Sequence, residues 1–441
     1  RIRVLGKVTA EGGLVAARRT GTGLRLVVSS AADPVDLTAP ETATTRGLRA
    51  ARGANRRALA ATTASDWLPR LTVRRRATGA TVRRVIAGCR AVSRPRVYSG
   101  LGMVTVLTLA TDRGLTVTDS DAVLTDGHVV YASPRSLYLA TPRWVDPAVA
   151  SGEAPRGTTL IHRFDTRSAT STEHSGSAGV PGYTLNQFSL SEHEGHLRVA
   201  TTQEPDWWEA PADGETSQSF VTVLSTAGGR LRETGRVGGL GRNERIYAVR
   251  FLGDRGYVVT FRQTDPLYSL DLSDPAAPRV TGELKINGYS AYLHPVDDGT
   301  LIGIGQDATD EGRILGTQVS LFDVRDPANP ARIAQKRLGA GYSEAENNHL
   351  AVLYWPATRT LVIPLESWGG PEGLEAPFTG AVALGVSRED GVRDIGRIAH
   401  GPGAPIRRAV VVGDDLYTLS ALGLKRNALA DLTERGFVPF S

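Results

Sequence analysis

Apolar and polar residues alternate along most of this chain, and the pattern is clearest in the stretch 255–286. Three apolar runs follow one another there, at 257–261, 267–272 and 280–286. Alternation with a period of two indicates β-strands, and the third run, polar at every second position, has one face in water. Between the second and third runs, Asp274-Pro275 favours a tight turn, because aspartate accepts a backbone hydrogen bond and proline fixes φ. The stretch therefore predicts three successive strands.

The same unit returns 52 residues later, where Phe322–Pro330 aligns without a gap on Leu270–Pro278. A further apolar run at 246–252, followed by the tight turn 253–256, adds a strand in front. Each repeat then holds four antiparallel strands, a to d. Repeats of about 40 to 50 residues with four strands each are typical of a β-propeller, whose blades bury their faces by stacking.

The pattern predicts an all-β fold, a β-propeller of about seven four-stranded blades, with eight blades possible if upstream sequence belongs to it. We expect 1–441 to form a single domain. Strands are expected at 14–17, 24–30 and 103–110; 128–133, 137–141 and 158–166; 183–191, 197–202, 219–224 and 231–237; 246–252, 257–261, 267–272 and 280–286; 291–296, 301–305, 319–324 and 331–338; 349–355, 361–365, 381–386 and 392–398; and 406–412, 416–420 and 424–429. The seventh blade lacks a clear fourth strand. Either 1–8 or 434–440 can supply it, and both alternatives stay open.

Residues 31–100 interrupt the first blade between strands b and c. They hold 14 arginines against four acids, so they carry +10 while the whole chain carries +5. We expect a mostly helical, Arg-rich cap, with a helix from Pro40-Glu41 to Ala64 that has proline and an acid in its first turn. Apolar residues are too sparse here for an independent core, so Trp67-Leu68-Pro69 should anchor the cap on the propeller. A solvated helix is favoured over an anion-binding patch.

Composition narrows the function classes only modestly. A net charge of +5 over 441 residues does not point to nucleic acid. The single cysteine, Cys89, excludes a disulfide within the chain. There is no apolar run of 18 residues, and 1–4 lacks the apolar core of a signal peptide. Sequence motifs of hydrolases, P-loop proteins and zinc enzymes do not occur, so an enzyme is the minority interpretation.

Long loops are expected on one side of the propeller only. The b-to-c loops include 204–216, 306–317 and 367–379, whereas the a-to-b and c-to-d connections are tight turns that leave little surface for a site. Five of the six tryptophans fall in b-to-c loops: Trp67, Trp144, Trp207, Trp208 and Trp368. Tryptophan is enriched at binding hot spots, so Trp144, Trp207, Trp208 and Trp368 are candidate binding residues. We give equal weight to the alternative that these rings only pack the loops against the scaffold.

Polar residues of strand a are further candidates, because strand a lines the central channel. Aligning the a-to-b turns places Asn186, Tyr247 and Ser290 in one register near the channel mouth, with His349 at the entrance of the sixth blade. The favoured alternative is that they hydrogen-bond channel waters.

Acidic and amide residues gather at the ends of strand b, as in Gln203-Glu204, Gln263 with Asp265, and Gln306-Asp307 with Asp310 and Glu311. Oxygen-rich loops can hold calcium, but no spacing matches a defined calcium loop, so solvated acids are favoured. Glu344, Glu346 and His349 form a weak metal hypothesis, because Asn347 and Asn348 between them are poor ligands. We therefore expect neither a metal nor another cofactor.

Several segments together carry a family resemblance: Leu185-Asn186-Gln187-Phe188-Ser189, Val199-Ala200-Thr201-Thr202, Ile246-Tyr247-Ala248-Val249-Arg250-Phe251, Pro266-Leu267-Tyr268, Asp271-Leu272-Ser273-Asp274-Pro275, Tyr289-Ser290-Ala291-Tyr292-Leu293-His294-Pro295 and Ser343-Glu344-Ala345-Glu346. With them the chain resembles secreted bacterial and archaeal proteins whose C-terminal β-propeller domain is distantly related to WD40 repeats. The resemblance implies export or cell-surface placement, a missing N-terminal part, and no established activity. Asn348 and Leu350 depart from the Asp and His that relatives often carry, which weakens the metal hypothesis.

These observations predict an extracytoplasmic binding or scaffold protein that meets its partner through the long-loop, Trp-rich face. A protein or another cell-envelope component is the expected partner rather than nucleic acid. The alternative is a hydrolase that acts on a cell-surface polymer with its site at the channel mouth.

Overall fold

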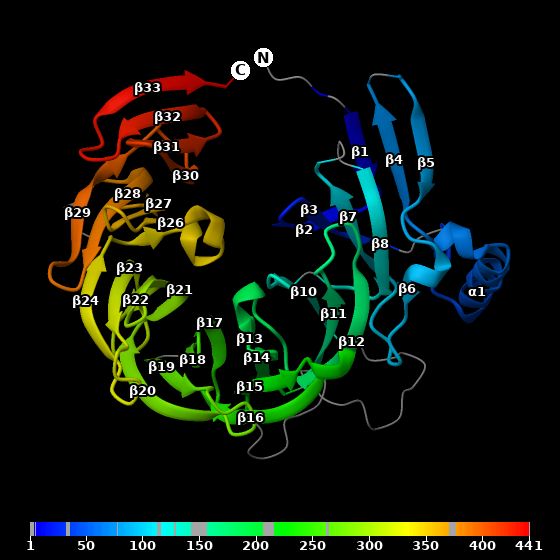
Figure 1. The fold of residues 1–441 in the computed structure, drawn as a ribbon, viewed down its shortest axis with the longest axis horizontal. Coiled ribbons are helices and arrows are strands. Elements are labelled where there is room, and N and C mark those ends of the chain that lie inside the picture. Colours follow the sequence, from blue (N-terminus) through cyan, green and yellow to red (C-terminus); the bar gives the residue numbers. More distant parts are fainter. Residues whose placement is uncertain are drawn as a thin grey trace. The chain divides into compact units, whose positions relative to one another are not determined.

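The computed structural model describes residues 4, 6–31, 36–76, 78–112, 116–127, 129–142, 157–205, 216–261, 264–369 and 376–440, shown as coloured ribbon in Figure 1. Its contacts divide the chain into two compact units: Arg1–Gln187 with Ser225–Arg232, and Phe188–Leu224 with Glu233–Ser441. Both units consist almost entirely of antiparallel strands. Within the described residues, no helix has the length and apolar character needed to span a membrane.

Two sheets of consecutive strands form most of the first unit. The first contains β2 (Gly13–Thr20), β3 (Gly23–Ser30), β7 (Met103–Ala110) and β8 (Thr116–Leu124), with the short β6 (Val92–Ser93) parallel to β8. The second contains β9 (Val129–Ala132), β10 (Ser136–Pro142), β11 (Thr158–Asp165) and β12 (Glu173–Pro181). The sequence pattern predicted only three strands for each of the first two blades, and β8 and β12 are the missing fourth strands.

The Arg-rich insertion is partly helical, as α1 (Thr45–Ala60) shows, but the expectation that it is mostly helical is wrong. It also contains the hairpin of β4 (Arg70–Arg75) and β5 (Thr81–Val85), and β4 pairs with β1 (Gly6–Ala10). Helix α1 is capped by Thr44, whose side chain accepts from the Gly47 amide, and its first turn holds no acid. Pro40 and Glu41 therefore lie ahead of the helix instead of in its first turn.

The β1–β4–β5 sheet covers one face of the first blade-like sheet. Leu71 and Ile86 from the insertion are buried in one cluster with Val28, Leu107 and Leu109, and Leu68 packs on a neighbouring cluster that includes Met103. Burial against the scaffold confirms that the insertion takes its core from the first sheet. Strand β1 pairs inside this unit, so the alternative in which 1–8 closes the last blade is wrong.

Five sheets form the second unit. They contain β13 (Leu190–His193), β14 (His196–Gln203), β15 (Gln218–Ser225) and β16 (Arg232–Leu240); β17 (Arg245–Leu252), β18 (Arg255–Phe261), β19 (Thr264–Asp271) and β20 (Arg279–Asn287); β21 (Tyr289–Asp297), β22 (Thr300–Ala308), β23 (Ile314–Asp323) and β24 (Ala331–Arg337); β25 (Gly341–Tyr342), β26 (Leu353–Trp355), β27 (Thr360–Ser367), β28 (Phe378–Ser387) and β29 (Gly391–Ile398); and β30 (Ile406–Val412), β31 (Asp415–Ser420), β32 (Gly423–Ala428) and β33 (Glu434–Pro439). Strand β33 pairs with β32 and so completes the last sheet.

Several boundaries differ from the sequence pattern. The predicted strand 183–191 is mostly irregular, with a short 3-10 helix, η3 (Gln187–Ser189), before β13. Another, η6 (His349–Ala351), takes the first half of the predicted strand 349–355. The predicted loop 306–317 is a tight hairpin, since only 309–313 separate β22 from β23. Short 3-10 turns also occur at η1 (Ala64–Trp67), η2 (Cys89–Ala91), η4 (Ala227–Gly229) and η5 (Glu344–Glu346).

A glycine in the fourth strand of one sheet makes room for the turn between the third and fourth strands of the next sheet. A Cβ atom on Gly235 of β16 would lie 2.6 Å from the Pro275 carbonyl oxygen, and one on Gly282 of β20 would lie 2.7 Å from that of Ala328. Such contacts are far inside van der Waals distance. The Asp-Pro turns of the repeat therefore pack directly against the glycine backbone of the neighbouring fourth strand.

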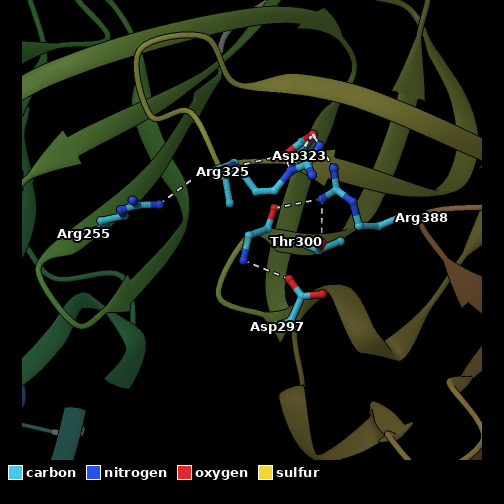
Figure 2. Close-up of polar contacts among 8 residues, drawn as sticks. Arg255, Asp297, Thr300, Asp323, Arg325 and Arg388 are labelled. Atoms are coloured by element: carbon cyan, nitrogen blue, oxygen red, sulfur yellow. Dashed lines mark hydrogen bonds and ion pairs between the residues drawn. The ribbon is translucent and has the colours of Figure 1, made fainter.

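Arginines join adjacent sheets at the same end. Arg198 donates to the Gly253 carbonyl oxygen at 2.8 Å, and Arg255 donates to that of Val324 at 3.2 Å. Figure 2 shows the most developed of these joints, where Arg388 from the β28–β29 turn reaches Thr300 at 2.9 Å and the carboxylate of Asp323. Arg325 binds the same carboxylate. These charge-assisted bonds tie the β21–β24 sheet to the sheet that follows it.

Candidate functional site

The predicted tryptophans divide between described and undescribed residues. Trp144, Trp207 and Trp208 lie outside the described residues, so their binding role stays a prediction. Trp368 follows β27 directly, in the predicted loop, and is 66% exposed. Its backbone amide donates to the Ala340 carbonyl oxygen at 3.1 Å, which fixes the main chain while the indole faces solvent.

Exposed apolar side chains continue beside Trp368. Ile314 and Leu315, at the start of β23, are 47% and 38% exposed. The next residue, Gly316, approaches the backbone of Ala340 so closely that a Cβ atom would lie 2.7 Å from the Ala340 Cα. Gly316 and Trp368 both lie against the backbone of Ala340, so the segments that carry these three exposed side chains are neighbours. We call Ile314, Leu315 and Trp368 the Trp368 patch.

Tyr247 belongs to a cluster of three aromatic rings at the start of the inner strands. Its ring centroid lies 4.7 Å from that of Tyr289 and 5.5 Å from that of Phe261, and the rings of Tyr289 and Phe261 are 4.8 Å apart. Arg245 covers the cluster, with its guanidinium 5.1 Å from the Tyr247 centroid and its Nη2 donating to the Tyr247 hydroxyl at 3.1 Å. The rings pack against one another and not around an open space.

Burial and the nearby carboxylate of Glu346 raise the pKa of Tyr289 to about 12, so its hydroxyl is neutral at physiological pH. Glu346 itself is held by three donors: Gln306 Nε2 at 2.6 Å, the Ser343 amide at 3.0 Å and Thr317 Oγ1 at 3.4 Å. Burial raises the pKa of Glu346 in spite of these bonds. The carboxylate therefore serves as an anchor of the η5 turn.

The predicted common register of Tyr247 and Ser290 is wrong by one residue. Ile246 pairs with Thr260 and Ala248 with Val259, so Tyr247 is the extra residue of a β-bulge. In β21 the extra residue is Ala291, because Ser290 pairs with Gly305 and Tyr292 with Ile304. Tyr247 thus corresponds to Ala291, and Ser290, which is only 1% exposed, corresponds to Ile246. A bulge re-aims the side chain it carries, and alternation alone does not reveal it.

His349 lies in a second aromatic cluster, built around Arg250 of β17. The ring of His349 meets Phe188 edge-on at 5.1 Å between centroids. Arg250 stacks on Phe188 at 4.2 Å and on Tyr292 at 5.3 Å, and its Nε donates to the Leu293 carbonyl oxygen at 2.9 Å. Burial and the charge of Arg250 lower the pKa of His294 in the same layer to about 4. Sequence reasoning did not single out Arg250, although its signal was present as a lone charge between Val249 and Phe251.

Asn186 belongs to the first unit and is partly buried just before η3. Its place beside Tyr247, Ser290 and His349 remains a prediction, since those three belong to the second unit.

Several residues of the two metal hypotheses already bind other side chains. Glu344 accepts from Asn348 Nδ2 at 2.6 Å and from Arg408 at 3.3 Å. Asp307 pairs with Arg337 at 2.6 Å, and Asp310 accepts from Asn287 at 2.5 Å. A group not singled out from the sequence lies on two neighbouring turns, where ligand atoms of His193, Glu194 and Asp254 fall within 4.8 Å of one another. Exposed acids of this kind occur without metals.

Comparison with known proteins gives one family and few informative relatives. The model of the beta propeller domain family matches residues 1–432. An uncharacterised protein of Archaeoglobus fulgidus is 44% identical over 181 residues, which is 41% of this chain and 26% of that protein. An uncharacterised protein of Methanocaldococcus jannaschii is 40% identical over 188 residues, 43% of this chain and 28% of that protein. The alignments thus span about a quarter of each relative. Among solved structures, Sqt1 of Saccharomyces cerevisiae superposes with a TM-score of 0.46 at 9% identity, over 79% of this chain and 84% of Sqt1.

Proposed function

The chain belongs to the beta propeller domain family, and on that premise we propose that it is an extracytoplasmic binding or scaffold module that docks a cell-envelope protein on its long-loop face. The Trp368 patch carries the proposal. Three large apolar side chains stand in solvent at 66%, 47% and 38% exposure, on a backbone that hydrogen bonds hold in place. A rigidly presented tryptophan with apolar neighbours is the composition of an interface hot spot.

The extracytoplasmic part of the proposal is supported only by the resemblance to secreted proteins. Fractionation of cells that produce the natural protein tests it directly. Recovery in the cytoplasmic fraction would refute this part and leave the docking surface untouched.

The docking surface is tested with Trp368→Ser, because serine removes the ring and keeps a small polar residue in the loop. We expect the fraction of purified protein that sediments with isolated envelopes to fall about 10-fold or more, as for loss of a hot-spot residue. Protease treatment of the envelopes should abolish binding if the partner is a protein. Val412→Ser is the matched control: Val412 is 60% exposed but lies where β30 ends at the turn to β31, at the tight-turn side.

Equal losses for both variants would refute a specific patch. Unchanged binding of Trp368→Ser would refute the proposal itself. Binding that survives protease treatment would assign the face to a polymer instead of a protein.

A hydrolase with its site at the channel mouth stays the alternative prediction. The described residues give this alternative little support at Glu346, the acid beside Tyr289, because its carboxylate already accepts three hydrogen bonds. If Tyr247→Phe abolished turnover of an envelope polymer while Trp368→Ser did not, the alternative would replace our proposal.

A further inference from the structure

A pocket of about 250 Å³ lies between the β21–β24 sheet and the sheet of β25–β29, at the tight-turn side where the sequence predicted little surface for a site. This volume is below the range of drug-sized sites. Val296, Pro356 and Val386 give it apolar walls. The pocket therefore suits a ligand of a few heavy atoms with an apolar part.

The floor of the pocket is fixed by charges that neutralise one another. Arg388 donates to the Gly299 carbonyl oxygen at 3.2 Å, to Thr300 Oγ1 at 2.9 Å and to the Asp323 carboxylate, as Figure 2 shows. The guanidinium of Arg388 thus donates these hydrogen bonds to protein atoms and not into the pocket. Asp297, at the rim, accepts from the Gly299 amide at 2.9 Å with one oxygen. Among the described residues it has no cation within ion-pair distance, although it is a full negative charge beside the pocket.

Arg359 on the opposite wall is held in a backbone conformation that normally selects glycine. Its φ is +52°, in the left-handed region that costs an ordinary residue free energy. Four other turns between a first and second strand contain a left-handed glycine, Gly21, Gly195, Gly253 or Gly413, and in one of them Glu194 is left-handed as well. Arg359 therefore keeps a long charged side chain at a position where the backbone conformation favours glycine. Arg359 pairs with Glu389 at 3.4 Å, and both side chains are largely exposed, at 62% and 71%.

Tyr354 also lines the pocket, together with Asp297 and Arg359. Burial raises the pKa of its hydroxyl, and the charges of Arg359 and Asp297 act on it with opposite sign, so both are near it. The lining of the pocket thus includes a guanidinium, a neutral hydroxyl and a carboxylate without an ion-pair partner among the described residues. Arg325 and Arg388 both bind Asp323, so the formal charges of Arg325, Arg359 and Arg388 balance those of Asp297, Asp323 and Glu389. This balance disfavours a ligand with a large net charge.

We propose that this pocket binds a small zwitterion of the free α-amino acid class, with its carboxylate on Arg359 and its ammonium group on Asp297. The carboxylate replaces the rim pair with Glu389, because an exposed ion pair is weak and easily exchanged. The Tyr354 hydroxyl donates to the ligand between the two charges. This site is separate from the Trp368 patch and does not depend on the docking proposal.

The test is isothermal titration calorimetry of the whole chain with each common free amino acid, followed by the N-acetyl and methyl-ester derivatives of the best ligand. Each derivative removes one charge, so each should lose about 10-fold or more in affinity, as for a lost charge-assisted hydrogen bond. Glucose, N-acetylglucosamine and inorganic phosphate are the comparison ligands, and we expect no heat from them.

Arg359→Gly is the decisive variant, because glycine suits the left-handed position and should leave the melting temperature unchanged or higher. We expect it to lose about 10-fold or more in affinity, and Asp297→Asn to lose as much. Glu389→Gln is the matched control on the same rim: it removes a competitor for Arg359, so affinity should rise or stay. Binding of a sugar or phosphate in place of a zwitterion, no binding at all, or full affinity in Arg359→Gly would each overturn the proposal.

Discussion

The joint at Asp323 gives a stability prediction with an internal control in the same fold. Asp323 and Asp165 occupy equivalent positions at the end of a third strand, and their side chains are 20% and 19% exposed. Each accepts from the backbone amide and the guanidinium of the arginine two residues later. Asp323 alone of the two also receives Arg388 from the next sheet. Changing each to asparagine therefore separates the joint between sheets from the local turn.

We expect Asp323→Asn to lower the free energy of unfolding by about 1–2 kcal/mol more than Asp165→Asn. A hydrogen bond to a charged group contributes ~1.5–3 kcal/mol, and partial exposure of both side chains reduces it. Arg325 and then Arg388 lower the pKa of Asp323. A lowered carboxyl pKa stabilises the fold above the ordinary aspartate range near ~3.9, and this stabilisation is lost as pH falls through the folded pKa. The difference between the variants should be constant from pH 5 to 8 and shrink in stronger acid.

Urea unfolding measures the free energies, and hydrogen exchange localises the effect. Amides at 299–300 should exchange faster in Asp323→Asn, because Arg388 no longer has a fixed anchor. Arg388→Met should add little to Asp323→Asn if the two residues form one joint. If the two asparagine variants differ by less than about 0.5 kcal/mol, the contact between sheets does not stabilise the protein and the reasoning fails.

Three further predictions follow from burial and close contact. Gly282→Ala should cost about 1–3 kcal/mol by pushing away the Pro327-Ala328 turn, whereas Gly13→Ala, with open space around its Cβ, should be neutral; thermal unfolding of both compares them. His162 is 2% exposed and burial lowers its pKa to about 4, so the unfolded chain takes up its proton first and this group alone should make the fold about 2 kcal/mol less stable at pH 5 than at pH 7.5; His162→Asn should remove this contribution in urea titrations and leave that of His294. Excision of 31–100 should expose Val28 and Leu107 and leave β1 without its partner, so the shortened chain should bind a hydrophobic dye and aggregate in size-exclusion chromatography; a monomeric, dye-free product would contradict this.

The strand pattern could be predicted because most strands bury one face or both, and alternation records burial. The Asp-Pro turns were equally clear, since 274–277 and 326–329 close by the expected aspartate bonds. The hairpin of β4 and β5 was missed because arginine interrupts its apolar positions, and β5 is exposed along most of its length. The boundary error at 349–355 has a similar origin, because an isolated apolar run does not distinguish a 3-10 turn from a strand.

The candidate site was harder to predict because β-bulges and contacts between sheets leave no periodic trace. Strand β21 has a second extra residue, Val296, that β17 lacks, so counting back from the turns does not bring Tyr247 into register with Ser290. The Trp368 patch joins residues that are more than 50 positions apart through the backbone of Ala340. Such neighbours follow from the stacking of sheets and not from any local pattern.

Residues that obey the repeat and residues that break it have different roles in this chain. The Asp-Pro turn of one sheet packs on the glycine of the neighbouring fourth strand, at Gly235 and again at Gly282. The two features recur together in the repeat because together they form the contact between sheets. Arg388 strengthens one such contact between sheets. A ligand that bound to Arg388 would have to break the hydrogen bonds of that contact. Arg359 departs from the repeat, because it holds a left-handed conformation directly before β27 and its exposed pair with Glu389 stabilises it little. A residue that costs backbone free energy without a compensating contact indicates a binding site more strongly than a residue that joins two sheets. We therefore place the small-molecule site at Arg359, although tight turns surround it.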